Sequence, residues 1–429
     1  MATGVGHASA RPRRAGPLSD NGSGRPGATM RTLAAIPNLD ALFSARVYDG
    51  VQPPLADERG AVVFDAPPVG SWTITLDRGR VLLARGRSAR PRSTITADPA
   101  TLAAVLDGRI SGVEAFLDHG LTVRGDLAFA LQIDGAFDIG ERPLSHPVVR
   151  VVTALGVRTS YLEAGRPDAP PVVLLHGLGG TNASMLPLLP DLVGDHRVIA
   201  PDLPGFGGSD APRWRYRASE LAAWLDAFCE CVQAPRVTLI GNSLGGRVAL
   251  ELALRRPDLV ERLILLCPSP AFRRLRQFAP VVRLLMPDAL LMPYPMPHRA
   301  VVMAIRSLFA EPDRLPARWY DAAADEHRRL MRRYRHRRAF YSALREIYLD
   351  TAYGTEGFWD RLPRLTPPAL FVWGAQDWLV PAAFSRHVSE AVPTAQCVVL
   401  DDCGHVPQFE HPERTAALIR DFLSAQGSS

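Results

Sequence analysis

Two regions of the chain differ in how hydrophobic and polar positions alternate. Between about residues 45 and 140, short segments alternate apolar and polar residues, which predicts half-buried antiparallel strands. These segments are AVVFDA, SWTITLD, RVLLARG and STITAD. Turn signals such as DRG lie between them. We therefore expect a small antiparallel sheet in this region.

Helix signals follow the last of these segments. Asp98 suits the N-cap, Pro99 the first helical position and Gly108 the C-cap of the segment ATLAAVLDG. GVEAFLDHG predicts a second short helix. LTVRGDLAFALQIDGAF predicts a strand, a break at Gly125 and an apolar helix. Together with the strands, these helices predict a small α+β domain.

From about residue 150 onward, apolar runs rich in β-formers alternate with helical segments. The runs are RTSYLEAG, PPVVLLHG, HRVIAPD, RVTLIGN, VERLILLCP, ALFVWGAQD and QCVVLDDCG. Segments such as RASELAAWLDAFCECVQA and LGGRVALELALRRP separate them and predict helices. This alternation predicts an α/β fold with a mostly parallel sheet that is covered on both faces.

These patterns divide the chain into three parts. Residues 1–29 lack an apolar stretch and are rich in Arg, Gly, Pro and Ser, so they predict either a disordered tail or sequence upstream of a start at Met30. The α+β domain is expected at 30–145 and the α/β domain at 146–429. The junction is ERPLSHPVV (141–149), which contains two prolines.

Charge and cysteine content narrow the possible functions. The net charge of +5 is too small to indicate a nucleic-acid partner, although it allows contact with an anionic membrane surface. The five cysteines form no CxxC pair, which argues against a zinc site or a disulfide framework and favours the cytoplasm. The most apolar stretch, FAPVVRLLMPDALLMPYPMP, is interrupted by prolines, Arg283 and Asp288, so a membrane span is not expected. The sequence makes no prediction of oligomeric state.

One motif in the second region suits a nucleophile. Ser243 lies in GNSLGG, directly after the strand-like run RVTLI and before a predicted helix. In a strand–turn–helix of this kind, small residues on both sides of the serine allow a tight turn that exposes its hydroxyl. The motif residues expected to support this turn are Gly241, Asn242 and Gly245.

A serine needs a base and an orienting acid to react. Asp377 follows the run ALFVWG, and His405 lies in a loop after the run QCVVL. The order Ser, Asp, His along the chain is the one found when these groups converge at one edge of an α/β sheet. We therefore expect Ser243 as nucleophile, Asp377 as acid and His405 as base.

The substrate's carbonyl oxygen would need hydrogen-bond donors. The segment LLHGLGG follows a strand and forms a glycine-rich turn that includes His176 and Gly177. The backbone N–H groups of Leu178 and Leu244 are the candidates for the oxyanion hole. No metal and no organic cofactor are expected for this chemistry.

Four motifs in the same order resemble the α/β-hydrolase superfamily. They are the HG motif, DLPGFGGS, GNSLGG and GHVPQFEHP, together with the acid after ALFVWG. The resemblance covers about 270 residues and implies the three catalytic roles given above. It also implies a helical cap at about 270–360, between the predicted strands VERLILL and ALFVWG. The basic segment HRRLMRRYRHRR in this insertion indicates a solvated helix face or contact with anionic lipid headgroups.

The first region resembles the sterol-carrier-protein type 2 domain. The similarity rests on GSWTITLDRGRVLLARG, STITADPATLAAVLDG and GLTVRGDLAFALQI and covers about 90 residues. It implies a five-stranded sheet whose helices enclose an apolar tunnel for sterols, fatty acids or acyl-CoA. The alternative is a small domain of similar fold whose core is filled by its own side chains.

The two resemblances together imply a serine hydrolase of a hydrophobic, lipid-like ester or thioester, with an attached lipid-binding domain. The wording of DLPGFGGSD and GNSLGG also suits a carbon–carbon bond hydrolase of ring-cleavage products. A third hypothesis is a non-catalytic lipid carrier or sensor that retains the hydrolase fold. Both enzymatic hypotheses require an activated serine, whereas the carrier hypothesis does not.

Overall fold

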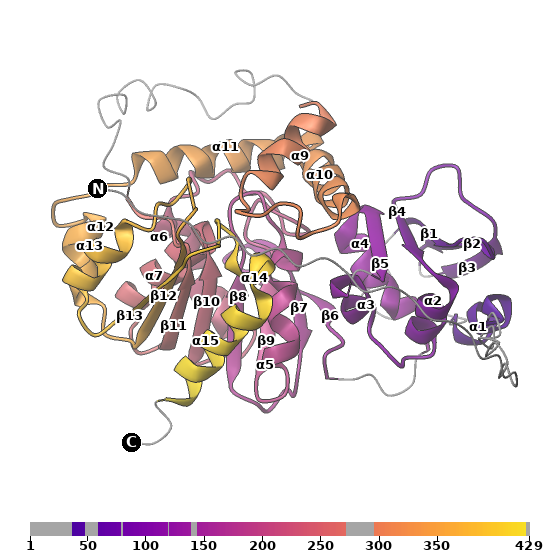
Figure 1. Ribbon diagram of the computed structural model, residues 1–429, viewed down its shortest axis with the longest axis horizontal. Coiled ribbons are helices and arrows are strands. Elements are labelled where there is room, and N and C mark those ends of the chain that lie inside the picture. Colours follow the sequence, from indigo (N-terminus) through magenta and orange to yellow (C-terminus); the bar gives the residue numbers. More distant parts are fainter. Residues whose placement is uncertain are drawn as a thin grey trace, which may run out of the picture. The chain divides into compact units, whose positions relative to one another are not determined.

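The first region folds into a five-stranded sheet with the order β3-β2-β1-β4-β5 (Figure 1). In this computed structural model, the described residues are 37–47, 59–78, 80–118, 120–138, 144–271 and 296–425. The strands are β1 (Gly60–Ala66), β2 (Gly70–Asp77), β3 (Arg80–Arg85), β4 (Ser93–Ala97) and β5 (Leu121–Gly125). Three of the four pairings are antiparallel as predicted, but β1 and β4 are parallel. The chain returns after β3 to the free edge of β1, which sets this direction. The predicted tail 1–29 lies outside the described residues.

Helices close one side of this sheet. They are α1 (Leu39–Arg46), α2 (Pro99–Leu106), α3 (Gly112–Leu117), α4 (Leu127–Gln132) and the short 3₁₀ helix η2 (Ile133–Ala136). Asp98 caps α2, since its carboxylate accepts hydrogen bonds from the N–H groups of Ala100 at 2.9 Å and Thr101 at 3.0 Å. Asp126 caps α4 in the same way by accepting from Phe129 N at 3.0 Å. The predicted helix starts are therefore confirmed.

Aromatic packing fills much of this core. Phe43 of α1 is fully buried and stacks on Trp72 of β2, with ring centroids 5.0 Å apart. Phe64 meets Phe43 edge to face at 5.3 Å. The indole N–H of Trp72 donates to Asp40 at 2.8 Å. The short first helix is thus fixed to the sheet by both apolar and polar contacts.

The second region forms an eight-stranded sheet with the order β13-β12-β11-β10-β8-β9-β7-β6 (Figure 1). Its strands are β6 (Val148–Ala154), β7 (Val157–Ala164), β8 (Pro171–Leu175), β9 (Arg197–Pro201), β10 (Val237–Asn242), β11 (Val260–Leu266), β12 (Ala369–Gly374) and β13 (Gln396–Leu400). Five of the seven neighbouring pairs are parallel, as predicted. Strand β6 was not predicted. It is a partly exposed edge strand that begins inside the expected junction 141–149.

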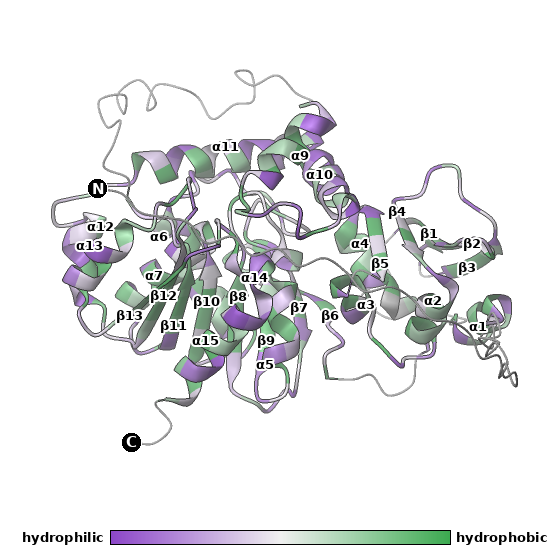
Figure 2. Cartoon of the chain, viewed as in Figure 1, coloured by the Kyte–Doolittle hydropathy of each residue, from purple (hydrophilic) through white to green (hydrophobic). Residues whose placement is uncertain are grey.

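Helices cover both faces of this sheet, as the alternating pattern predicted. One face packs against α6 (Ala218–Cys231), α7 (Leu244–Arg255) and α13 (Phe384–Ala391). The other packs against η3 (Asn182–Leu188), α5 (Leu189–Leu192) and α15 (Pro412–Ser424). The central strands between them are hydrophobic along their length (Figure 2). Burial on both sides explains why these strands read as continuous apolar runs.

The predicted insertion lies between β11 and β12. Its described part contains α9 (His298–Arg306), α10 (Ala317–Arg332), α11 (Tyr334–Leu349), α12 (Phe358–Arg361) and η6 (Leu362–Arg364). The basic segment HRRLMRRYRHRR spans the end of α10 and the start of α11. Leu330 and Met331 within it are buried, so this segment has a packed side as well as a charged one. No helix in the described part of the chain is both long and apolar enough to cross a membrane.

A largely buried ion network connects the five-stranded sheet to α10. Arg329 of α10 binds Glu326 at 2.6 Å and Asp126 at 3.2 Å, and Asp126 also binds Arg92 at 2.7 Å. Glu326 in turn accepts a hydrogen bond from the backbone N–H of Leu127 at 3.3 Å. Burial raises the pKa of Glu326 despite its pairing with Arg329.

Arg124 supplies a second link across the same boundary. Its guanidinium binds Asp325 through two nitrogens, at 2.7 and 3.1 Å. The Arg124 side chain is 61% exposed, whereas that of Arg329 is 21% exposed. Only Arg329 lies between buried carboxylates. Water can therefore replace the partners of Arg124 more readily than those of Arg329.

We predict that Arg329→Ala lowers the free energy of unfolding by about 3 kcal/mol, because it leaves Glu326 and Asp126 buried with too few partners. Arg124→Ala is the matched control and should cost at most about 1 kcal/mol, since exposed ion pairs contribute little. Urea unfolding followed by circular dichroism measures both values. Equal losses in the two variants would contradict this ranking.

Candidate active site

Ser243 occupies the turn between β10 and α7, as predicted. Its backbone φ is +54°, a left-handed conformation that few residues other than glycine adopt. The Ser243 N–H donates to the carbonyl of Leu266 at 2.9 Å, and its own carbonyl accepts from Arg247 N at 3.0 Å. The strained turn is therefore held by strand β11 on one side and by the first turn of α7 on the other.

Two glycines make this turn possible. A Cβ atom at Gly245 would lie 2.3 Å from the carbonyl oxygen of Leu175 in β8. A Cβ atom at Gly241 would lie 2.6 Å from the backbone of Gly245. Both distances are far inside van der Waals contact, and the atoms met are backbone atoms that cannot turn away. Helix α7 can thus start this close to the sheet only with glycine at both positions.

His405 and Asp377 meet at the end of the sheet. His405 Nδ1 lies 2.7 Å from Asp377 Oδ2, and both side chains are buried. The other carboxylate oxygen of Asp377 accepts from the N–H groups of Leu379 and Val380, each at 2.9 Å. An ionised carboxylate can only accept hydrogen bonds, so this contact favours the tautomer with the proton on Nδ1 and leaves Nε2 as an acceptor.

Asn242 connects this pair to the serine turn. Its amide group donates to the carbonyl of His405 at 3.1 Å and to the carbonyl of Leu266 at 3.0 Å. The His405 N–H donates to the carbonyl of Leu308, which follows α9 of the insertion. The histidine loop is therefore positioned by both the sheet and the insertion. The contact with Leu308 had no signal in the sequence.

The predicted oxyanion donors have unused N–H groups. Leu244 is the first residue of α7, where helical N–H groups have no acceptor within the helix. Leu178 lies in the loop after β8 and lines the same cavity as Ser243. Within the described residues, neither N–H donates to another protein group. Their suitability as donors stays a prediction.

His176 and Gly177 shape the loop that carries Leu178. His176 Nε2 accepts from Leu203 N at 3.0 Å, and Nδ1 lies 2.8 Å from the Gly177 carbonyl, to which it donates. Burial lowers the pKa of His176 to about 4, so the ring is neutral and its tautomer is fixed by these bonds. A Cβ atom at Gly177 would lie 3.2 Å from the Ser243 side chain. Both residues support the site by packing, and neither is placed to exchange protons with a substrate.

Two further carboxylates, Asp401 and Asp402, lie on the loop before His405 and are the candidates for the acid if Asp377 is not the acid. Asp402 pairs with Arg314 at 3.1 Å and His411 at 3.3 Å.

Among the described residues, one group could hold a metal: Cys267, Asp377 and His405, whose donor atoms lie within 4.8 Å of one another. Burial raises the pKa of the Cys267 thiol well above its usual value, which disfavours the thiolate that a metal requires. These residues therefore fit an acid–base pair better than a metal site.

A cavity of about 450 Å³ opens onto Ser243 and His405. Much of its apolar lining comes from the insertion, for example Ile305, Leu308 and Phe340. His327 of α10 also lines it, and burial lowers the pKa of this histidine, which keeps it neutral. No sequence pattern indicated that His327 would line this cavity, because His327 and Ser243 are far apart along the chain and meet only through tertiary packing.

The cavity also has lining residues from the five-stranded sheet region. They are Phe116, Val123, Gly125 and Leu127. The sequence patterns assigned these residues to a separate lipid-binding domain and did not place them in the cavity that Ser243 lines. The contact arises from the packing of β5 and α4 on α10, which the chain order does not reveal.

Comparison with known proteins agrees with this fold. Residues 170–412, more than half of the chain, match the family described as alpha/beta hydrolase fold. The chain belongs to the α/β-hydrolase family. Residues 51–138 match the SCP-2 sterol transfer family, so an α/β-hydrolase follows a sterol-carrier-like domain in this chain.

Relatives of this α/β-hydrolase include named hydrolases. It is 33% identical over 267 residues to the pimeloyl-[acyl-carrier protein] methyl ester esterase of Aromatoleum aromaticum, covering 60% of this chain and 99% of that protein. It is 28% identical over 306 residues to the 2-hydroxymuconate semialdehyde hydrolase of Pseudomonas sp. strain CF600, covering 66% and 96%. The chain is accordingly a hydrolytic enzyme.

A solved structure supports the fold. A bacterial membrane phospholipase A superposes on this α/β-hydrolase with a TM-score of 0.57 and 23% identity, covering 76% of this chain and 95% of that one. At this identity, the similarity shows the fold and carries no argument on substrate.

We predict that Gly245→Ala destabilises this α/β-hydrolase by at least about 1–3 kcal/mol, because its Cβ atom would overlap the Leu175 carbonyl. Gly194→Ala is the matched control, since a Cβ atom there meets nothing within 4 Å. Chemical denaturation measures both variants. A Gly245→Ala protein as stable as the Gly194→Ala protein would show that the turn tolerates a side chain.

Proposed function

We propose that the chain hydrolyses a hydrophobic carboxylic ester or thioester through an acyl-enzyme at Ser243. The observation that carries this proposal is the cavity of about 450 Å³, in which an apolar lining converges on a serine and a histidine. Its size suits a small to medium organic ligand. A cavity of this composition favours an acyl chain over a polar substrate.

In the proposed mechanism, Ser243 Oγ attacks the carbonyl carbon while His405 Nε2 accepts the serine proton. His405 then donates that proton to the leaving oxygen or sulfur, and the acyl group stays on Ser243. Water attacks this ester with His405 again as base, which releases the acid and restores the serine. Asp377 holds the imidazole in the required tautomer throughout, as its 2.7 Å hydrogen bond supports.

The proposed oxyanion hole consists of the N–H groups of Leu178 and Leu244. In the tetrahedral intermediate, the negative oxygen would accept from both. The start of α7 adds the positive end of the helix dipole at this position. No cofactor takes part in these steps.

Carbon–carbon bond hydrolysis is the second candidate function. It is favoured by the 28% identical relative named as a 2-hydroxymuconate semialdehyde hydrolase. The relative named as a methyl ester esterase, at 33% identity, favours ester cleavage instead. The same three residues serve both reactions, so the site alone does not separate them. Parallel assays with p-nitrophenyl esters and a ring-cleavage dienoate distinguish the two.

The third hypothesis, a lipid carrier or sensor without catalysis, has less support. In the described residues, the apolar cavity inside the sterol-carrier-like domain measures about 50 Å³. Ligand sites for small molecules usually measure about 300–1,000 Å³. In this conformation the domain can receive part of a chain, but it cannot enclose a whole lipid.

Contact with an anionic membrane surface remains a proposal based on the basic segment of α10 and α11. Arg332, Arg333 and Arg335 are exposed there. Near an anionic bilayer, each such residue contributes about 1 kcal/mol of attraction. A cytoplasmic location likewise stays a prediction from the cysteine content.

We expect Ser243→Ala to abolish covalent labelling by a fluorophosphonate and to lower ester hydrolysis by several orders of magnitude. Ser389→Ala, at an exposed serine of α13, is the control and should label normally. In-gel fluorescence and intact-protein mass spectrometry read out the label. Undiminished labelling of the Ser243→Ala protein would assign the nucleophile to another residue.

We expect Asp377→Asn to reduce kcat by about 10³–10⁴-fold, because an amide no longer enforces the tautomer that leaves Nε2 as the base. The neighbouring Asp402→Asn tests the alternative acid and should retain full activity. Steady-state hydrolysis of a short p-nitrophenyl ester measures both. If the losses were reversed, Asp402 would be the acid.

A further inference from the structure

Two cavities in the chain share one wall. The catalytic cavity and the small cavity of the sterol-carrier-like domain are both lined by Phe116, Val123 and Leu127. Phe116 belongs to α3, Val123 to β5 and Leu127 to α4. One layer of apolar side chains therefore separates the space in front of Ser243 from the interior of the other domain.

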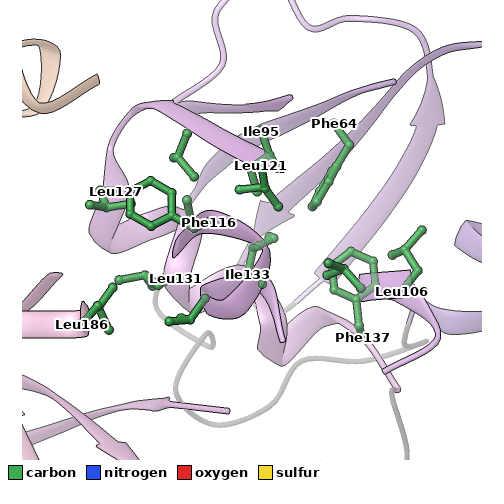
Figure 3. A pocket seen from close by; sticks show the side chains of 15 residues that line it. Phe64, Ile95, Leu106, Phe116, Leu121, Leu127, Leu131, Ile133, Phe137 and Leu186 are labelled. Carbon is green, nitrogen blue, oxygen red and sulfur yellow. The ribbon is translucent and has the colours of Figure 1, made fainter. Parts of the chain in front are cut away.

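The small cavity is apolar throughout. Its remaining lining includes Ile95, Leu106 and Phe137 from the same domain (Figure 3). Leu186 of η3 reaches it from the hydrolase side and lies beside Leu131 (Figure 3). With no charged or polar side chain in its lining, this space suits methylene and methyl groups.

The shared wall is fixed to the insertion by the ion network. Glu326 accepts from Leu127 N, and Arg329 joins Glu326 to Asp126 directly before Leu127. Arg124, next to Val123, binds Asp325 of the same helix. Two of the three wall residues are thus adjacent in sequence to residues that hold the domain against α10, so the wall has a defined position relative to that helix.

The catalytic cavity is lined by both reactive and apolar side chains. Ser243, His405 and Leu178 line it together with the shared apolar wall. Glu326 also lines the cavity, but its carboxylate is already bound to Arg329 and to Leu127 N. The carbonyl of a substrate must lie at Ser243 to react. The end of its acyl chain can then contact the apolar wall.

We propose that Phe116, Val123 and Leu127 form the far wall of the acyl-chain site and that the cavity behind them receives the end of a long acyl chain when these side chains yield. The sterol-carrier-like domain is then a part of the hydrolase's substrate site and sets its chain-length preference. This inference rests on the proposed function, in which Ser243 reacts with a hydrophobic acyl compound.

The test measures labelling of the full chain at Ser243 by n-alkyl fluorophosphonates, from butyl to hexadecyl. Phe116→Ala should raise the hexadecyl-to-butyl ratio of labelling rate constants, by about fourfold for each methylene that the opened space admits. Leu127→Ala should raise it in the same direction. Phe116→Trp should lower it, because a larger ring thickens the wall.

Leu82→Ala is the control. Leu82 of β3 belongs to the same domain, is 58% exposed and lines neither cavity, so the ratio should stay within about twofold of that of the unmodified chain. Thermal unfolding confirms that each variant is folded. An unchanged ratio in folded Phe116→Ala and Leu127→Ala proteins would overturn the inference, since the chain would then extend in another direction.

The labelling ratio separates this inference from the proposed function. If Ser243 is labelled and the ratios shift but no p-nitrophenyl ester is cleaved, ester hydrolysis is wrong and the acyl site stands. If esters are cleaved and the ratios do not shift, the reverse holds. If no fluorophosphonate labels Ser243, the serine mechanism and the acyl site are both wrong.

Discussion

The close approach of α7 to β8 is the constraint on which the site depends. Gly245 lies against the Leu175 carbonyl, and Gly241 lies against Gly245. This contact forces Ser243 into a left-handed conformation at the end of β10 and places the start of a helix directly beside it. Asn242, at the same turn, then fixes the carbonyl of His405. A single steric condition thus sets the positions of Ser243, the N–H of Leu244 and the loop of His405.

A second constraint acts where the sterol-carrier-like domain meets helix α10. Buried carboxylates are tolerated only when they are paired, and Asp126 and Glu326 share Arg329. Because Asp126 also caps α4, the same group ends β5, starts α4 and binds α10. The position of Leu127 in the catalytic cavity follows from that shared pairing. The ion network is therefore less a source of stability than a means of fixing which surfaces meet.

Local signals predicted most of the fold and the places of Ser243, Asp377 and His405 at the ends of strands. The elbow at Ser243, the two later strand ends with Asp377 and His405, and the capped helices all depend on neighbours in sequence. The parallel pairing of β1 with β4 and the edge strand β6 were missed, since pairing and exposure depend on distant residues. For the same reason, no sequence pattern indicated that Phe116 would line the serine's cavity. Residues that act through tertiary packing carry only an apolar signal, which core residues share.

The size of the small cavity decides between two roles for the sterol-carrier-like domain. At about 50 Å³, it cannot shield a whole lipid from water, which is what carriage requires. The end of a chain needs far less space, and the remainder would lie in the catalytic cavity of about 450 Å³. In the proposed acyl site, division of one substrate between the two spaces removes the need for a transfer step, because both domains would bind the acyl group while its carbonyl faces Ser243. Fusion in one chain then has a physical reason: the two domains complete a single apolar surface, and neither could bury it alone.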